Sequence, residues 1–209
     1  MEKKVKVVWL TQFSNSDIRA HLPLELPLIQ RLYYYIRGFH AATPVDRFPW
    51  NTNMLIQAEK LIDKVELYVV CPYRNIRKRK VSFPLRGINY VFIKDQDSES
   101  VLNFIKKRFV KNPCPTYKSN WIRLEKEINK IHPDIIHLIG AENVNYSPAI
   151  INLSKRYKTI VQLQTLMIDP EFRNKYPITD KTYMYRTHWE ELVLKSVHYV
   201  GTNSPLFEK

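Results

Sequence analysis

Polar side chains that can bind hydroxyl groups follow two of the apolar, strand-like runs in this sequence. Glu142 and Asn143 come just after the run that ends at Ile139, and Gln164 follows the next run along the chain. Carboxylate and amide groups at the end of a buried strand can orient the hydroxyl groups of a substrate. We therefore treat these three residues as candidates for substrate binding, with an exposed loop acid as the alternative interpretation of Glu142.

Two further carboxylates, Asp95 and Asp97, follow the apolar run Ile88–Ile93. Carboxylates at this spacing can hold Mg²⁺ or Mn²⁺ against a diphosphate. A competing interpretation is that Asp97 or Ser98 caps a following helix, with Glu99 favouring its positive end. We favour capping and expect no metal site in this chain.

The chain carries 33 Lys and Arg against 20 Asp and Glu, a formal net charge of +13. Two short stretches concentrate this charge: Arg74, Arg77, Lys78, Arg79 and Lys80, and then Lys106, Lys107, Arg108 and Lys111. Such clusters attract nucleic acid, anionic membranes or phosphorylated substrates, although a solvated loop and the polar face of a helix explain them equally. Arg77, Lys78, Arg79 and Lys80 are our candidates for contact with phosphate or a membrane. Many of the aromatic residues fall in apolar runs that should be buried, so we expect no specific binding of nucleic acid.

Several strong catalytic and cofactor signatures are missing. Only 4 of the 209 residues are glycine, and the loop 11–17 after the first apolar run has none. A dinucleotide or a Walker-type ATP site needs glycine there for a tight turn and close approach to phosphate, so these cofactors are disfavoured. The sequence has no Gly-x-Ser-x-Gly or His-Glu-x-x-His motif. No apolar run reaches the ~18 residues of a transmembrane helix, so we expect a cytoplasmic protein.

The elements that position these residues follow from the hydrophobic pattern. Compact apolar runs predict buried strands at Val5–Leu10, Val65–Cys71, Ile88–Ile93, Asp134–Ile139, Thr159–Leu163 and His198–Gly201. Helical spacing of apolar residues occurs between most of them, at 54–62, 101–109, 121–131, 149–153 and 185–193. Alternating helices and nearly continuous apolar strands predict an α/β fold, a Rossmann-like three-layer sandwich with a mainly parallel sheet. Ligands bind such sheets at the carboxyl ends of the strands.

Four segments of the sequence are informative in their order along the chain: 4–15, Phe48–Asn53, Pro133–Glu142 and Trp189–Gly201. Together they resemble the N-terminal domain of a bacterial glycosyltransferase of the GT-B fold, in the broad group that contains family 4. The resemblance spans nearly the whole chain. It implies that residues 1–209 form one Rossmann-like domain that binds the acceptor. A second, C-terminal domain would bind the nucleotide sugar. That donor half usually carries two glutamates with seven residues between them, and no such pair occurs here.

The resemblance also suggests substrates and partners. By position, Asn15, Glu142, Asn143 and Gln164 would contact the acceptor, a sugar or lipid-linked glycan of surface polysaccharide synthesis. This domain would bind no cofactor, and the complete enzyme would use a nucleotide-sugar donor without a metal. Its place would be the cytoplasm, with weak attraction to the inner face of the membrane. The alternative is a non-catalytic basic module that binds polyanions.

The end of the sequence supports the two-domain expectation. Ser204 and Pro205 have the types that cap and open a helix, yet only four residues follow. An isolated helix of about one turn is marginal. We therefore expect that the chain is the N-terminal part of a longer protein.

Overall fold

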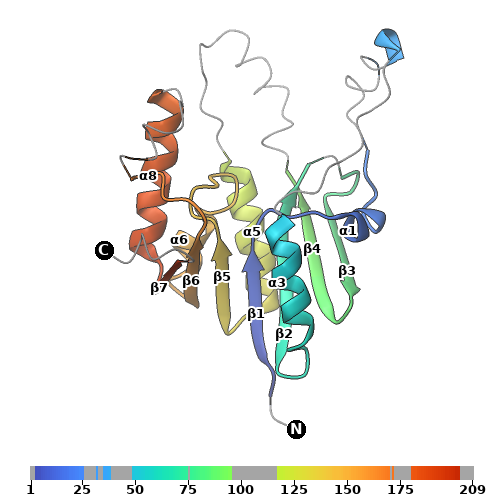
Figure 1. The fold of residues 1–209 in the computed structure, drawn as a ribbon, viewed down its shortest axis with the longest axis horizontal. Helices are drawn as coiled ribbons and strands as arrows, with labels where there is room; N and C mark the ends of the chain where they lie inside the picture. The colour runs from blue at the N-terminus through green and yellow to red at the C-terminus, as the bar shows by residue number, and fades with distance from the viewer. Residues whose placement is uncertain are drawn as a thin grey trace.

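The computed structural model describes residues 3–25, 32, 35–38, 49–74, 76–95, 117–169, 171 and 180–202. Within these residues the strands form one seven-stranded sheet in the order β3-β4-β2-β1-β5-β6-β7 (Figure 1). Their bounds are β1 Val5–Leu10, β2 Val65–Tyr73, β3 Lys80–Leu85, β4 Ile88–Lys94, β5 Ile135–Ile139, β6 Lys158–Leu163 and β7 Tyr199–Thr202. The six predicted strands are confirmed to within two residues at each end.

The sheet is mainly parallel, as the sequence predicted. Central strand β1 pairs in parallel with β2 on one side and with β5 on the other. The pairs β2–β4, β5–β6 and β6–β7 are parallel as well. The chain thus leaves β1 toward β2 and later continues on the opposite side at β5. This reversal puts a topological switch point between the carboxyl ends of β1 and β5, where open α/β sheets bind ligands.

The edge strand β3 was not predicted from the sequence. It pairs with β4 in antiparallel register through a tight turn at Arg86 and Gly87, both of which have positive φ, 49° and 78°. Positive φ at both central residues fits a hairpin whose strands keep their right-handed twist. The strand alternates exposed and half-buried residues instead of forming an apolar run. Because β3 has no apolar run, its first residue, Lys80, looks in the sequence like the end of a basic loop.

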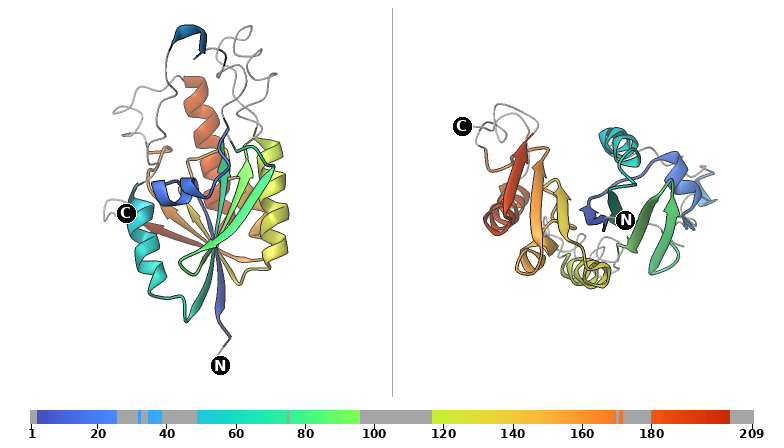
Figure 2. Two further views of the ribbon diagram at one scale, coloured as in Figure 1. Left: turned by 90° about the vertical axis from the view of Figure 1, so that its right-hand side faces the viewer. Right: turned by 90° about the horizontal axis from the view of Figure 1, so that it is seen from below.

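Helices cover both faces of the sheet. Their bounds are α1 Ser16–Ala20, α3 Pro49–Glu59, α5 Lys118–Ile131, α6 Ala149–Leu153 and α8 Asp180–Ser196. Buried side chains of α5, α6 and α8 pack in one core cluster with β1, β5 and β6. Those of α1 and α3 pack in another with β2 and β4. The view along the sheet in Figure 2 shows the helices on its two sides, which confirms three layers. The helix expected at 101–109 lies outside the described residues.

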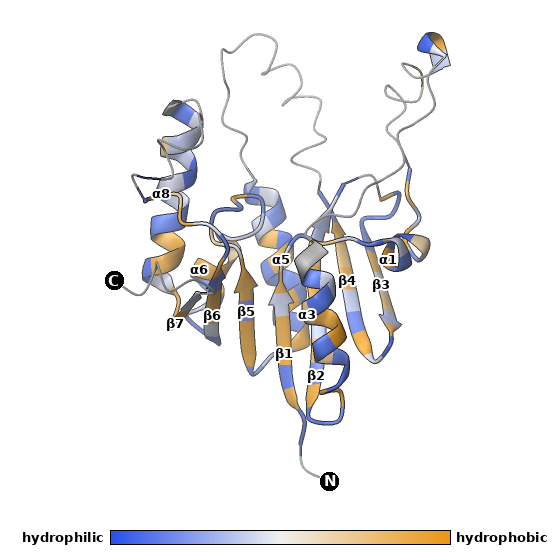
Figure 3. Cartoon of the chain, viewed as in Figure 1, coloured by the Kyte–Doolittle hydropathy of each residue, from blue (hydrophilic) through white to orange (hydrophobic). Residues whose placement is uncertain are grey.

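Hydrophobic residues run along the strands (Figure 3), and their buried side chains belong to two core clusters, under different helices. On β1, Val8 and Leu10 belong to the core under α5 and α6, where Ile136 and Leu138 of β5 meet Leu124 of α5. All five side chains are fully buried. Burial on this scale, at about 25 cal/mol per Å² of apolar surface, is the main stabilising contribution to the fold.

Truncation of a buried side chain on β5, next to the central strand, should test this core. Leu138→Ala removes a fully buried side chain from β5, and we expect a loss of about 2–5 kcal/mol in the free energy of unfolding because a cavity remains. The control Ile122→Ala trims a side chain of α5 that is 56% exposed, so its effect should stay within about 0.5 kcal/mol. Urea unfolding followed by circular dichroism measures both; equal losses would contradict the packing described.

Candidate functional site

A cavity of about 370 Å³ lies at the carboxyl edge of the sheet, at the switch point between β1 and β5. This edge is at the top of the sheet in Figure 1. Loops after β1, β2 and β5 line the cavity together with residues before α5 and on α8. The lining residues are Gln12, Arg74, Tyr117, Glu142, Asn143, Val144, Asn145, Thr182, Tyr185 and Arg186.

The turn after β5 brings two predicted residues together. Asn143 Nδ2 donates a hydrogen bond to Glu142 Oε1 at 2.7 Å. Gly140, at φ +86°, lies beneath this pair, and a Cβ atom there would lie 2.7 Å from Asn143 Nδ2 and 3.0 Å from Glu142 Oε1. The position therefore requires glycine twice, for the left-handed backbone and for space. Tyr146 Oη donates to the carbonyl of Ile139 at 2.6 Å and so fixes the turn on the strand.

The carboxyl group of Glu142 is unusual for a group that lines a cavity. Glu142 is only 7% exposed, and burial raises its pKa against the opposing effects of its backbone N–H, Arg186 and Asn143. Its Oε2 is buried and has no hydrogen-bond partner among the described residues. An unsatisfied buried acceptor costs about 1–3 kcal/mol. A hydroxyl donor from a bound molecule would satisfy it.

Helix α8 holds the loop after β5, which lines the cavity, and the loop after β6. Arg186 Nε donates to the Glu142 carbonyl at 3.2 Å, on the loop after β5. One turn further along, fully buried Glu190 accepts hydrogen bonds from the backbone N–H groups of Met167 at 3.1 Å and Ile168 at 2.8 Å. Burial raises the pKa of Glu190 to about 7, and the charge of Glu142 adds to this, whereas the two N–H groups and Arg186 lower it.

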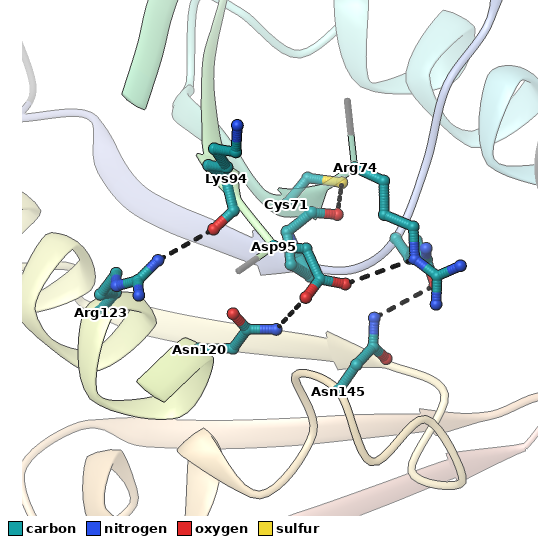
Figure 4. Close-up of polar contacts among 9 residues, drawn as sticks. Cys71, Arg74, Lys94, Asp95, Asn120, Arg123 and Asn145 are labelled. Atoms are coloured by element: carbon teal, nitrogen blue, oxygen red, sulfur yellow. Dashed lines mark hydrogen bonds and ion pairs between the residues drawn. The ribbon is translucent and has the colours of Figure 1, made fainter. Parts of the chain in front are cut away.

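A second polar cluster joins the cavity to β2, β4 and α5 (Figure 4). Asp95, directly after β4, is 1% exposed and accepts a hydrogen bond from Asn120 Nδ2 at 2.8 Å. Its Oδ2 lies 3.7 Å from Nε of Arg74. Next to it, Asn145 Nδ2 donates to Gln12 Oε1 at 3.4 Å and connects the loops after β5 and β1. Asp95 is thus engaged with an amide and a guanidinium group.

These contacts do not support a metal site at Asp95 and Asp97. Asp97, its second carboxylate, lies outside the described residues, as do Ser98 and Glu99. Within the described part of the chain, no group of three or more His, Cys, Asp or Glu residues is placed to hold a metal ion.

The other two predicted acceptor residues do not line this cavity. Asn15 Oδ1 accepts the backbone N–H of Ile18 at 2.9 Å and caps α1. Asn15 lines a different, smaller cavity of about 70 Å³. Gln164 follows β6 and is not among the residues that line the larger cavity. An acceptor role for any of the four stays a prediction, and the geometry favours Glu142 and Asn143.

Sequence reasoning missed two charged residues of this site. Arg74 directly follows β2, at the same edge as Glu142, but in the sequence it belongs to a basic stretch that also fits a solvated loop. Glu190 is not among the residues that the sequence analysis proposes. The sequence did contain a signal for Glu190, because Arg186, Glu190 and Val193 recur at helical spacing and so share one face of a helix. In the structure Glu190 and Val193 are fully buried.

The basic residues after Arg74 lie at this edge as well. Arg77, Lys78 and Arg79 are exposed. Lys80 begins β3 and forms an ion pair of 2.6 Å with Glu127 of α5. The stretch 106–111 lies outside the described residues. No helix in the described ranges is long and apolar enough to cross a membrane.

Comparison with solved structures reveals a shared fold. The chain is similar to sucrose-phosphate synthase from Thermosynechococcus elongatus, with a TM-score of 0.51 and 10% identity over 98% of this chain and 44% of that chain. A structure of trehalose-6-phosphate synthase from E. coli bound with UDP-2-fluoro glucose matches with a TM-score of 0.49 and 13% identity, over 97% and 41% of the two chains. The chain spans less than half the length of either. The sequence matches no family model and no curated protein.

The sucrose-phosphate synthase is a glycosyltransferase of the GT-B class, so the Rossmann-like α/β fold expected from the sequence is shared with a member of that class. Membership of the group that contains family 4 stays a prediction.

Gly140→Ala should disturb the turn that carries Glu142 and Asn143. A left-handed non-glycine residue costs about 1–3 kcal/mol in unfolding free energy, and the crowded Cβ adds to that cost. Gly201→Ala is the matched control, because a Cβ there meets nothing closer than 3.8 Å and φ is not positive. Urea unfolding compares the two variants; a Gly140→Ala protein as stable as Gly201→Ala would contradict the described turn.

The buried carboxyl of Glu190 should make stability depend on pH. Its pKa of about 7 lies above the ordinary 4.5, so the folded state binds more protons than the unfolded state between these values. The free energy of unfolding therefore falls as pH rises through this window, by roughly 3 kcal/mol for this group. Urea unfolding at pH values of about 5 and about 8 should show a smaller fall for Glu190→Gln than for wild type. Glu191→Gln, on the exposed face of the same helix, should retain the wild-type fall.

Proposed function

We propose that this chain is the acceptor-binding half of a glycosyltransferase that moves a sugar from a nucleotide-sugar donor to a hydroxyl group. One observation carries the proposal: a cavity of about 370 Å³ lies at the β1–β5 switch point and is lined mainly by amide, hydroxyl, carboxyl and guanidinium groups. Such a volume is within the ~300–1,000 Å³ of typical ligand pockets. The fold shared with sucrose-phosphate synthase supports the same class of reaction.

In this proposal Glu142 and Asn143 orient the acceptor. The partnerless Oε2 of Glu142 accepts the proton of an acceptor hydroxyl as a hydrogen bond, while Asn143 holds Oε1 in place. Gln12 and Asn145, which touch each other across the two loops, offer further amide groups to sugar hydroxyls. A second domain closing over this edge would exclude water, so that the activated sugar meets the acceptor instead of hydrolysing.

The donor is assigned to a second domain because the usual phosphate site of a Rossmann-like fold is filled here. The loop after β1 contains Phe13 and Ser14, both 1% exposed, in place of glycines. Helix α1 has only five residues, and the side chain of Asn15 already accepts one of its first N–H groups. This end of α1 therefore offers little to a diphosphate.

The finer expectations of the sequence belong to this proposal. The acceptor would be a sugar or a lipid-linked glycan of surface polysaccharide synthesis, at the inner face of a membrane. Exposed Arg77, Lys78 and Arg79 lie at the same edge as the cavity, which supports attraction of this edge to an anionic surface. A non-catalytic polyanion-binding module is the second candidate, and the same three side chains favour it.

The proposal predicts that the 209-residue chain alone transfers no sugar, since no donor is held against the acceptor. Transfer from radiolabelled nucleotide sugars is measured for the chain alone and for the chain combined with a nucleotide-sugar-binding domain. Activity should require the combination. Robust turnover by the chain alone would overturn the division of labour.

In the active combination, Glu142→Gln should raise the KM for the acceptor about tenfold or more, because an amide N–H₂ replaces the oxygen that accepts the hydroxyl. Glu191→Gln is the matched control on the exposed face of α8, and it should leave KM unchanged. An unchanged KM in Glu142→Gln would remove Glu142 from the acceptor site.

A further inference from the structure

Two arginines from different elements line the cavity, and each has its Nε nearest to an acceptor in the wall. Arg74, directly after β2, has its Nε 3.7 Å from the buried carboxylate of Asp95 (Figure 4). Arg186, on α8, donates from Nε to the Glu142 carbonyl at 3.2 Å. The hydrogen bond of Arg186 orients its guanidinium plane and leaves the outer edge for other partners, while Arg74, whose side chain is 50% exposed, is held near Asp95 by charge alone.

The outer nitrogens of both side chains are available to a ligand. Among the described residues, neither Arg74 nor Arg186 forms a hydrogen bond or ion pair through Nη1 or Nη2. A guanidinium fork binds phosphate oxygens in pairs, and partial fixation reduces the entropy lost on binding. Arg77, the next arginine in the chain, differs because it does not line the cavity.

From this arrangement we infer that the cavity binds an acceptor that carries a phosphate group, with Arg74 and Arg186 as its phosphate ligands. The inference rests on the proposed function and names the substrate class of the same site. Gln12, Asn143 and Asn145 line the rest of the cavity and suit the hydroxyl groups of the sugar.

The charges around the cavity allow an anion. Asp95 offsets the charge of Arg74 only, from behind its Nε. The described lining residues include two arginines and one carboxyl group, that of Glu142, whose pKa is raised by burial. The cavity of about 370 Å³ lies at the small end of ligand pockets and suits a monosaccharide phosphate.

Calorimetric titration of the 209-residue chain with glucose 6-phosphate, inorganic phosphate and glucose tests the inference. Glucose 6-phosphate should bind about tenfold or more tightly than glucose, and Arg74→Gln or Arg186→Gln should remove this advantage. Arg156→Gln, at an exposed arginine that does not line the cavity, is the matched control and should leave it intact. Arg74→Lys and Arg186→Lys keep the charge without the fork and should recover only part of it. Thermal unfolding identifies any variant that fails to fold, and the Lys variants then carry the test.

Vesicles distinguish the source of the phosphate. If the acceptor phosphate belongs to a lipid, the chain should bind phosphatidylcholine vesicles that contain phosphatidic acid, in a manner lost in Arg74→Gln and Arg186→Gln. Binding of those vesicles that is lost only in Arg77→Gln would place the anion on the outer surface and overturn the inference. Equal affinity for glucose and glucose 6-phosphate, without Arg74-dependent vesicle binding, would overturn it as well.

The inference and the proposed function can fail separately. Sugar transfer to a neutral acceptor, unaffected by Arg74→Gln and Arg186→Gln, would sustain the function and end the phosphate assignment. Arginine-dependent binding of glucose 6-phosphate without transfer to any acceptor, when the donor domain is present, would sustain the phosphate site and end the function.

Discussion

The parallel pairing of β1 with strands on both of its sides determines most of what this molecule presents at its surface. Since β2 and β5 run in the same direction as β1, the loops that follow all three strands meet at one edge. After β1 the chain continues on one side of it, at β2, and it later returns to the other side, at β5. The loops after β1 and β5 therefore separate and leave a hollow between them. The polar cavity occupies that hollow, and the apolar core lies below it.

Buried carboxylates then connect the elements around the hollow. Asp95 joins the end of β4 to Asn120 of α5, and Glu190 joins α8 to the loop after β6. A buried carboxylate without donors costs several kcal/mol, so each of these groups disfavours arrangements in which its partners move away. Polar contacts therefore set the shape of the site, whereas apolar packing stabilises the sheet beneath it.

Scarce glycine has a consequence for the kind of ligand this edge can bind. Gly140 occurs where the turn under Glu142 leaves no room for a Cβ atom. The loop after β1 has no glycine, and Asn15 caps the short helix that follows. The cavity is thus lined by side-chain amides, carboxyl and guanidinium groups instead of the backbone N–H groups that bind diphosphates. Such a lining suits hydroxyl groups and single anionic groups.

The sequence by itself determined the layered α/β fold, because buried parallel strands are apolar on both faces and leave uninterrupted runs. It also located Glu142 and Asn143, since a residue just after a strand must lie at the sheet edge. It did not determine β3, whose alternating pattern becomes a strand only through pairing with β4. Nor did it determine that Asn15 caps α1 outside the cavity. It also did not determine that Arg186 and Glu190 hold the loops after β5 and β6. The partners of these last two lie 44 and 22–23 residues away, and only tertiary packing of α8 against the sheet brings such distant groups into contact.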